Sequence, residues 1–311
     1  MVVDTSVSIG SVVLPNPVMT AAGTSGHGAE LHDFGPLNSL GAVVVKSLAA
    51  FPWPGNPAPR LHPISNGMLN AVGLQGPGVM QWASDHLQKL AEHEARVVIS
   101  LWGRTADEYE EAAEQVRAVL HSIRFAASIV AVEVNLSCPN VSGHGIIAHD
   151  PDLSAEIIRR CGRIERPVWA KLSPNTDRLA DLAEIVHASG AEAVTLVNTV
   201  SALVLDERTG RSVLGRGSGG GLSGRVIHPI AVKAVHDVRI ACPDLPIIGV
   251  GGVTQAWEAV ELMMVGANAV QVGTATFADP RAPFRIAADL ATWAADRGHR
   301  ALRDLTNIYH S

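Results

Sequence analysis

Cysteine is scarce in this chain. Only Cys138, Cys161 and Cys242 occur in 311 residues, at wide spacings and with no C-x-x-C pair. An odd and dispersed set of cysteines argues against a disulfide framework, a structural zinc site and an iron–sulfur cluster. We therefore expect free thiols and a reducing compartment.

Long apolar runs and a strong net charge are also absent. No stretch reaches the roughly 18 apolar residues of a membrane span, and residues 1–16 lack the basic and apolar regions of a secretory signal. The formal net charge is −6 and the basic clusters are short, so nothing indicates nucleic-acid binding. These absences predict a cytoplasmic protein without a membrane or nucleic-acid partner.

Lysine is rare, with four residues against twenty arginines. Two of the four, Lys46 and Lys171, end apolar segments that are typical of core strands. A lysine this close to a core is costly unless it is paired or binds an anionic or electron-rich ligand. We interpret both as ligand contacts, with a lysine that reaches the solvent from the rim of the fold as the alternative.

Short β-branched runs alternate with longer amphipathic runs along the whole chain. The predicted strands cover 17–21, 41–47, 96–101, 130–136, 167–172, 192–198, 246–250 and 269–274. The predicted helices include 105–123, which begins with a capping box at Thr105 and Glu108, and 150–164, 176–190 and 254–267, the last two ending at Gly190 and Gly266.

This alternation predicts a parallel sheet, and the apolar strands predict burial on both of its faces. Eight strands favour an α/β fold of the (β/α)₈ TIM-barrel type, a single domain over 1–311 with long βα loops. A doubly wound sheet is the alternative. Three long connections, 48–78, 137–150 and 199–224, follow carboxyl ends of strands, where barrel enzymes build their active sites.

Glycines follow the last two predicted strands, in "GVGG" (249–252) and "VGTA" (272–275). This pair of adjacent strands carries the phosphate site of many barrels, although two tight turns would have the same composition. The segment "GGGLSG" (219–224) matches the dinucleotide fingerprint only weakly, because it does not open a first βαβ unit. We therefore do not expect this chain to bind NAD directly.

The segment "VEVNLSCPNVSGHG" (132–145) places Cys138 between Asn135 and Asn140. A thiol with a pKa near ~8.5 can exchange a proton close to neutral pH, so Cys138 is the candidate general base. A small core cysteine is the alternative reading. Asparagine offers a donor and an acceptor, and Asn70 and Asn198 add to the pair beside Cys138. These side chains suit a small ligand with alternating C=O and N–H groups.

Several ordered motifs resemble the class 1 dihydroorotate dehydrogenases, most closely the catalytic subunit of the type B enzymes. They are "LPNPVMTAAGTSG", "GNPAPR", "NAVGLQ", "NLSCPN", "VWAKLSPN", "TLVNT", "GGLSG", "PIIGVGGV" and "AVQVGTATFADP", and they run nearly end to end. The resemblance implies an FMN-dependent barrel that oxidises (S)-dihydroorotate to orotate in pyrimidine biosynthesis. It assigns to Cys138 the removal of the C5 proton while a hydride passes from C6 to flavin N5.

The resemblance also implies the binding residues. Those at substrate positions are Lys46, Asn70, Ala71, Val72, Gly73, Leu74, Asn135, Asn140, Asn198 and Thr199. Those at FMN positions are Thr24, Lys46, Ser47, Ser100, Asn135, Lys171, Val197, Gly224, Gly251, Gly252, Gly273 and Thr274. Lys171 is expected near the flavin N1–C2 carbonyl region, where its charge would stabilise the reduced ring.

The sequence departs from the family pattern at a few places. Ser100 and Gly76 stand where asparagine is usual, the segment after "VNT" lacks the usual arginine, and the glycine run 219–221 has one extra member. The resemblance implies a homodimer joined to a subunit carrying FAD and an iron–sulfur cluster, with NAD⁺ as final acceptor. A homodimer that uses fumarate, a barrel acting on another reduced pyrimidine like dihydropyrimidine dehydrogenase, and a non-catalytic flavin-binding barrel are the alternatives.

Overall fold

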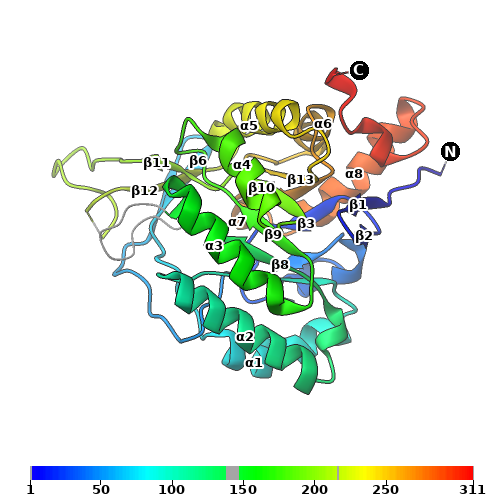
Figure 1. Cartoon of the computed structure of the whole chain (residues 1–311). Helices are drawn as coiled ribbons and strands as arrows, with labels where there is room; N and C mark the ends of the chain where they lie inside the picture. The colour runs from blue at the N-terminus through cyan, green and yellow to red at the C-terminus, as the bar shows by residue number, and fades with distance from the viewer. Residues whose placement is uncertain (1, 138–146, 216, 311) are drawn as a thin grey trace.

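The computed structural model describes residues 2–137, 147–215 and 217–310 (Figure 1). The candidate base Cys138, the predicted substrate contact Asn140 and the loop residue His144 lie outside these ranges.

Eight parallel strands form one sheet, and each of the eight predicted strands is present. They are β3 (Val18–Thr20), β4 (Val43–Val44), β7 (Val97–Leu101), β8 (Ile129–Asn135), β9 (Val168–Lys171), β10 (Ala193–Leu196), β13 (Ile247–Val250) and β14 (Ala269–Val272). Their order is β3-β14-β13-β10-β9-β8-β7-β4. A parallel bridge between Met19 and Ala42 joins the two outer strands, so the sheet closes into a (β/α)₈ barrel.

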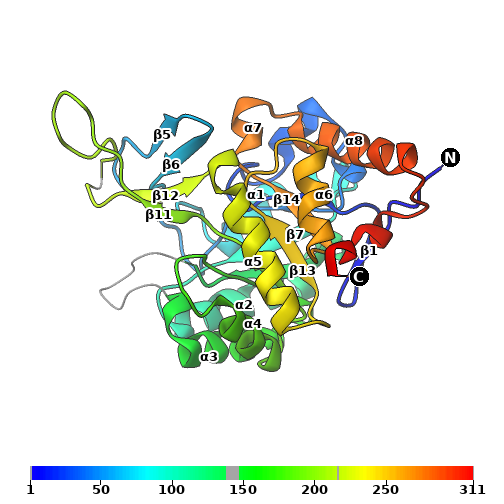
Figure 2. The same ribbon diagram turned by 90° about the horizontal axis from the view of Figure 1, so that it is seen from above.

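Helices surround the barrel on its outer side (Figures 1 and 2). They are α1 (Val79–Glu92), α2 (Ala106–Ser122), α3 (Pro151–Cys161), α4 (Leu179–Ala188), α5 (His228–Ala241), α6 (Ala256–Met264), the short α7 (Ala275–Ala278) and α8 (Ala282–Asp296). Short 3₁₀ segments lie at Ala29–Phe34, Leu37–Ser39, Ala126–Ser128, Ile147–His149, Gly162–Ile164, Arg225–Ile227, Leu302–Leu305 and Ile308–His310.

The helix ends follow the signals in the sequence. The side chain of Thr105 caps α2 by accepting a hydrogen bond from the backbone N–H of Glu108. The Glu108 carboxylate accepts from the backbone N–H of Arg104, so only half of the predicted capping box forms. Gly190 and Gly266, which follow α4 and α6, have φ angles of 111° and 126°, the left-handed region that favours glycine after a helix.

Two antiparallel sheets were not predicted. The hairpin of β1 (Val7–Ile9) and β2 (Val12–Leu14) packs on the lower layer of the barrel interior, beside Trp169 and Ile248. A four-stranded sheet of β5 (Leu61–Ile64), β6 (Gly67–Asn70), β11 (Val200–Ala202) and β12 (Gly220–Ser223) projects from the barrel (Figure 2). This second sheet unites two of the three long connections, because β6 pairs with β12.

The barrel interior has an apolar lower layer and a polar upper layer. Successive side chains of a strand point to opposite faces, and on β8 Ala131 belongs to the inner apolar cluster while Val132 and Val134 pack outward. Glu133 therefore points inward, one layer above Ala131. The same alternation places Lys171 on β9, Thr195 on β10 and Gln271 on β14 in the upper layer, with exposures between 0% and 5%.

Candidate active site

A cavity of about 660 Å³ lies over the carboxyl ends of the barrel strands. This volume suits a cofactor or a small-molecule ligand. The antiparallel sheet contributes one wall, through residues of β6, β11 and β12. The cavity is lined by these residues named from the sequence: Thr24, Lys46, Ser47, Asn70, Ala71, Val72, Gly73, Leu74, Asn135, Lys171, Val197, Asn198, Thr199, Gly224, Gly251, Gly252, Gly273 and Thr274.

Ser100 is the one described candidate outside the cavity lining. It is fully buried on β7, and its hydroxyl lies 2.9 Å from that of Ser47. The amide of Asn135 donates to the same Ser47 hydroxyl at 3.4 Å. Ser100 therefore positions Ser47, which lines the cavity, through a hydrogen bond. Its own position does not predict a direct hydrogen bond to a ligand.

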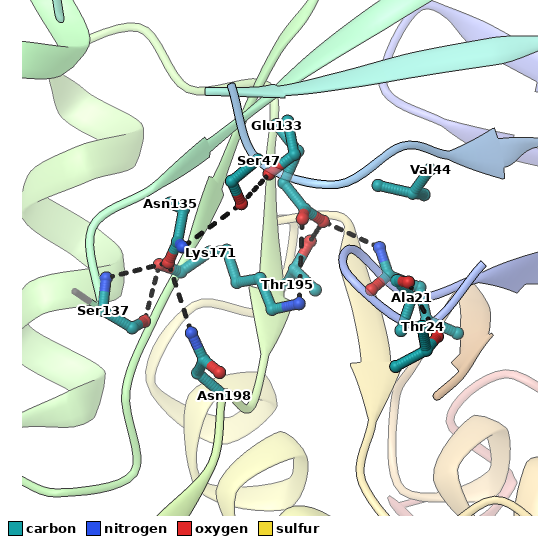
Figure 3. Close-up of polar contacts among 12 residues, drawn as sticks. Ala21, Thr24, Val44, Ser47, Glu133, Asn135, Ser137, Lys171, Thr195 and Asn198 are labelled. Carbon is teal, nitrogen blue, oxygen red and sulfur yellow. Dashed lines mark hydrogen bonds and ion pairs between the residues drawn. The ribbon is translucent and has the colours of Figure 1, made fainter. Parts of the chain in front are cut away.

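Asn135 is held from several directions at the end of β8 (Figure 3). Its side-chain oxygen accepts from the amide of Asn198 at 3.2 Å and from the backbone N–H of Ser137 at 3.2 Å. Its backbone carbonyl accepts a 2.6 Å bond from the hydroxyl of Tyr109 on α2. These bonds fix the Asn135 amide in one orientation at the cavity wall. A group that recognises a polar ligand by hydrogen bonds must be held in this way.

The segment from Asn70 to Leu74 is anchored at its first two residues. The Asn70 amide donates to the carbonyl of Gly221 on β12 at 3.0 Å, and the Asn56 amide donates to the carbonyl of Ala71 at 3.0 Å. A Cβ atom on Gly221 would lie 2.1 Å from the Thr199 hydroxyl. The glycines at 219–221 thus serve the close packing of this sheet over the cavity, which explains the weak match to a dinucleotide fingerprint.

The two lysines named from the sequence both reach the cavity. Lys171, on β9, is 5% exposed, and its Nζ atom lies 3.8 Å from Oε1 of Glu133 (Figure 3). Lys46 follows β4, and its ammonium group has neither a hydrogen bond nor an ion pair within the described residues. Burial, and then the charge of Arg60, lower the pKa of Lys46 because both disfavour its charged form. An anionic ligand would relieve that cost.

The glycines after β13 and β14 form a tight corner of the cavity. Gly251 and Gly252 have φ angles of 138° and 72°, and a Cβ atom on Gly252 would lie 2.7 Å from Cβ of His228. The first residues of α5 therefore approach the turn closely, which only glycine allows. Beside it, the Thr274 hydroxyl donates to that of Ser223 at 2.8 Å. Bare backbone and two hydroxyls at one corner fit a phosphate group.

Sequence reasoning missed several cavity residues and the layer beneath them. Ser137, Asn175 and Ser223 line the cavity without having been singled out. The Asn175 amide donates to the carbonyl of Thr199 at 3.0 Å, so it links the β9 and β10 loops. The "SPN" and "LSG" motifs that contain Asn175 and Ser223 were the available signals. Glu133 was also passed over, although a lone carboxylate within the apolar segment 130–136 was the available signal.

Residues 2–137, 147–215 and 217–310 contain neither a metal-binding cluster nor a membrane-spanning helix. No group of three or more His, Cys, Asp or Glu side chains in those ranges could hold a metal ion. No helix within them is long and apolar enough to cross a membrane.

Comparisons with known proteins agree over the whole chain. The family model described as dihydroorotate dehydrogenase matches residues 5–293. The chain is 41% identical over 312 residues to the catalytic subunit of dihydroorotate dehydrogenase B (NAD(+)) of Desulforudis audaxviator, covering 100% of this chain and 99% of the relative. It is 39% identical over 304 residues to the protein of the same name in Geobacter sp. strain M21, covering 97% of each.

A third relative carries a different acceptor in its name. The protein of Solibacter usitatus with the provisional name dihydroorotate dehydrogenase A (fumarate) is 41% identical over 300 residues, which cover 96% of each chain.

Proposed function

The chain belongs to the dihydroorotate dehydrogenase family, and from this premise we propose how its cavity binds FMN and dihydroorotate. It is a class 1, type B enzyme that oxidises dihydroorotate to orotate in pyrimidine biosynthesis. The observation that carries the proposal is that every described candidate except Ser100 lines one cavity at the carboxyl ends of the strands.

FMN fits the donor set along one side of this cavity. The glycine turn of Gly251 and Gly252 and the hydroxyls of Thr274 and Ser223 would hold the phosphate. Lys171 would face the polar edge of the isoalloxazine ring, where its charge matches the electrons that the ring gains. When bound, FMN supplies the two-electron acceptor for the hydride that leaves C6 of the substrate.

Dihydroorotate fits the opposite side. It has a cyclic imide with alternating carbonyl and N–H groups and a carboxylate. The amides of Asn70, Asn135 and Asn198 offer matching donors and acceptors, and their fixed orientations exclude rings without that pattern. The ammonium group of Lys46, a partly buried residue, has no protein partner among the described residues and would bind the carboxylate.

Cys138 is the base in this proposal. In the sequence it follows Asn135 by three residues and Ser137 directly, and both of these residues line the cavity. Its thiolate would take the C5 proton, which leaves as the C6 hydride leaves, so that the C5–C6 double bond of orotate forms. Cys138→Ser should slow reduction of the flavin by dihydroorotate by about 10²-fold or more at neutral pH, because a hydroxyl is a much weaker base.

Cys242→Ser is the matched control for that variant, since Cys242 lies at the end of α5, away from the cavity lining. Stopped-flow absorbance of the flavin measures both rates. Equal rates for the Cys138 and Cys242 variants would remove the role given to Cys138.

Electrons leave the flavin through another subunit in this proposal. Two relatives are named as catalytic subunits of NAD(+)-linked enzymes, which implies a partner subunit. We propose that the chain forms a homodimer, that the partner carries FAD and an iron–sulfur cluster, and that NAD⁺ is the final acceptor. The purified chain alone should then reduce neither NAD⁺ nor fumarate with dihydroorotate, and addition of the partner should restore NAD⁺ reduction. Fumarate turnover by the chain alone would contradict this acceptor.

A further inference from the structure

A carboxylate lies directly beneath the cavity, on the inner face of the barrel. Glu133 has no exposed surface, and its Oε2 atom accepts hydrogen bonds from the Thr195 hydroxyl at 2.9 Å and the Gln271 amide at 2.7 Å. Its Oε1 atom has no hydrogen-bond partner within the described residues and faces Lys171 Nζ at 3.8 Å. Both bonded donors are neutral, so Lys171 is the group that balances the buried charge.

This arrangement is costly for stability. A buried carboxylate loses its hydration, and replacing a buried ion pair by apolar side chains is often neutral or stabilising. The layer immediately below is built that way, from Ala131, Trp169, Ala193 and Ile248 among others. The charged pair occurs only in the layer that meets the cavity, which indicates that its role concerns what the cavity binds.

The geometry also limits where the ammonium group can lie. Lys171 extends from β9, and its side chain keeps only 7% of its surface exposed. A flexible lysine without a partner would turn toward solvent through the open side of the cavity. The Glu133 carboxylate below attracts the ammonium group toward the floor, and a separation of 3.8 Å leaves its N–H donors free to serve a ligand above.

We propose that Glu133 is a positioning residue for the flavin reaction: it holds Lys171 at the cavity floor and offsets part of the positive charge that Lys171 presents to the ring. The inference rests on the proposed binding of FMN in this cavity. Glu133 does not touch the ligand, and it acts through Lys171 and through its field. It keeps the flavin harder to reduce than Lys171 alone would make it.

The test is the midpoint potential of the bound flavin in Glu133→Gln. This substitution preserves the shape of the side chain and removes its charge, so the site gains a net positive charge and reduction becomes easier. We expect the equilibrium constant for two-electron reduction to rise at least tenfold, which corresponds to about 30 mV. Anaerobic spectroelectrochemistry measures the potential, and a merely structural role would not move it.

Thr195→Val is the matched control, because it removes a hydrogen bond from the same carboxylate and keeps the charge. Its reduction equilibrium should stay within twofold of the wild type. Glu133→Asp covers the case in which Glu133→Gln does not fold: it keeps the charge but moves it about one methylene from Lys171, so the potential should rise less, in the same direction.

A potential of Glu133→Gln or Glu133→Asp that equals that of Thr195→Val, with flavin bound in each, would overturn the inference and leave the proposed function intact. A wild-type protein that binds no FMN would overturn both.

Discussion

The pair of Lys171 and Glu133 couples the cavity floor to the stability of the barrel. Lys171→Met keeps a long side chain but leaves the buried Glu133 carboxylate without its cation. At the observed 3.8 Å, the Coulomb attraction at an effective dielectric constant of 20 is roughly 4 kcal/mol, and breaking a buried pair costs about 3–5 kcal/mol. Because Glu133 keeps two neutral donors, we expect the lower end, a loss of about 3 kcal/mol in the free energy of unfolding.

A double-mutant cycle in the flavin-free protein tests this value by equilibrium urea unfolding followed by circular dichroism. Glu133→Gln alone should cost about 1–2 kcal/mol, since it loses a charge–charge attraction but keeps its shape. The double variant leaves no buried charge, so it should lose about 2 kcal/mol, whereas additive costs would total about 4–5 kcal/mol.

Lys89→Met, on the exposed face of α1, is the matched control and should stay within about 0.5 kcal/mol of the wild type. Additivity of the Lys171 and Glu133 variants within about 0.5 kcal/mol would refute the reasoning, because it would show that the two charges do not interact.

Three further predictions address other parts of the molecule. Iodoacetamide at pH 7.5 should label Cys138 and leave Cys161 unmodified in the folded protein, because burial raises the pKa of the Cys161 thiol to about 12. Peptide mass spectrometry detects the label at both cysteines, and a label on Cys161 before unfolding would contradict its burial. Gly252→Ala should lower the free energy of unfolding in urea by at least about 1 kcal/mol more than Gly298→Ala does. Both glycines have positive φ, but only Gly252 has backbone and side-chain atoms within 4 Å of the new Cβ. Equal losses for the two variants would contradict the close packing at Gly252. Hydrogen bonds from a nearby serine and from an arginine close to the C-terminus lower the pKa of Asp4 to about 2, so its stabilising contribution is present above its ordinary value of 3.8 and is lost as the pH falls toward 2. Asp4→Asn should therefore make the melting temperature less dependent on pH between 4 and 2, and an unchanged slope would show that this contribution is absent.

The barrel was predictable because its strands are short β-branched runs, and most of them are separated by a helix. Most predicted strands were too long at the cavity end. Segment 41–47 is a strand only over Val43–Val44, because the chain turns away there to expose Lys46 and Ser47 to the cavity. Apolar or small residues continue past the point where ladder pairing stops, so composition alone does not show the end of such a strand.

The antiparallel sheet over the cavity could not be predicted in the same way. Its strands are only partly buried, contain glycine and proline, and pair residues as distant as Asn70 and Gly221. Neither periodicity nor local turn signals report a pairing over that separation. The long connections that contain these strands were recognisable as site-forming from their position alone.

The positions of individual side chains depended on closure of the barrel. Ser100 and Glu133 both point into the interior, but which neighbours they meet depends on the register between strands far apart in the sequence. The sequence therefore named Ser100 as a ligand contact and passed over Glu133. Asn135 and Lys171 were identified as site residues because they end their strands. The direction of the chain alone places such residues at the rim of the barrel.

The proposed function requires that dihydroorotate reduce a flavin held in this cavity. The measurement is the visible absorbance of the purified chain under anaerobic conditions, before and after addition of dihydroorotate. We expect the yellow spectrum of bound FMN and its loss within one turnover after dihydroorotate, while dihydrouracil leaves it unchanged. A colourless protein that does not take up FMN, or a flavin that dihydrouracil bleaches and dihydroorotate does not, would contradict the account.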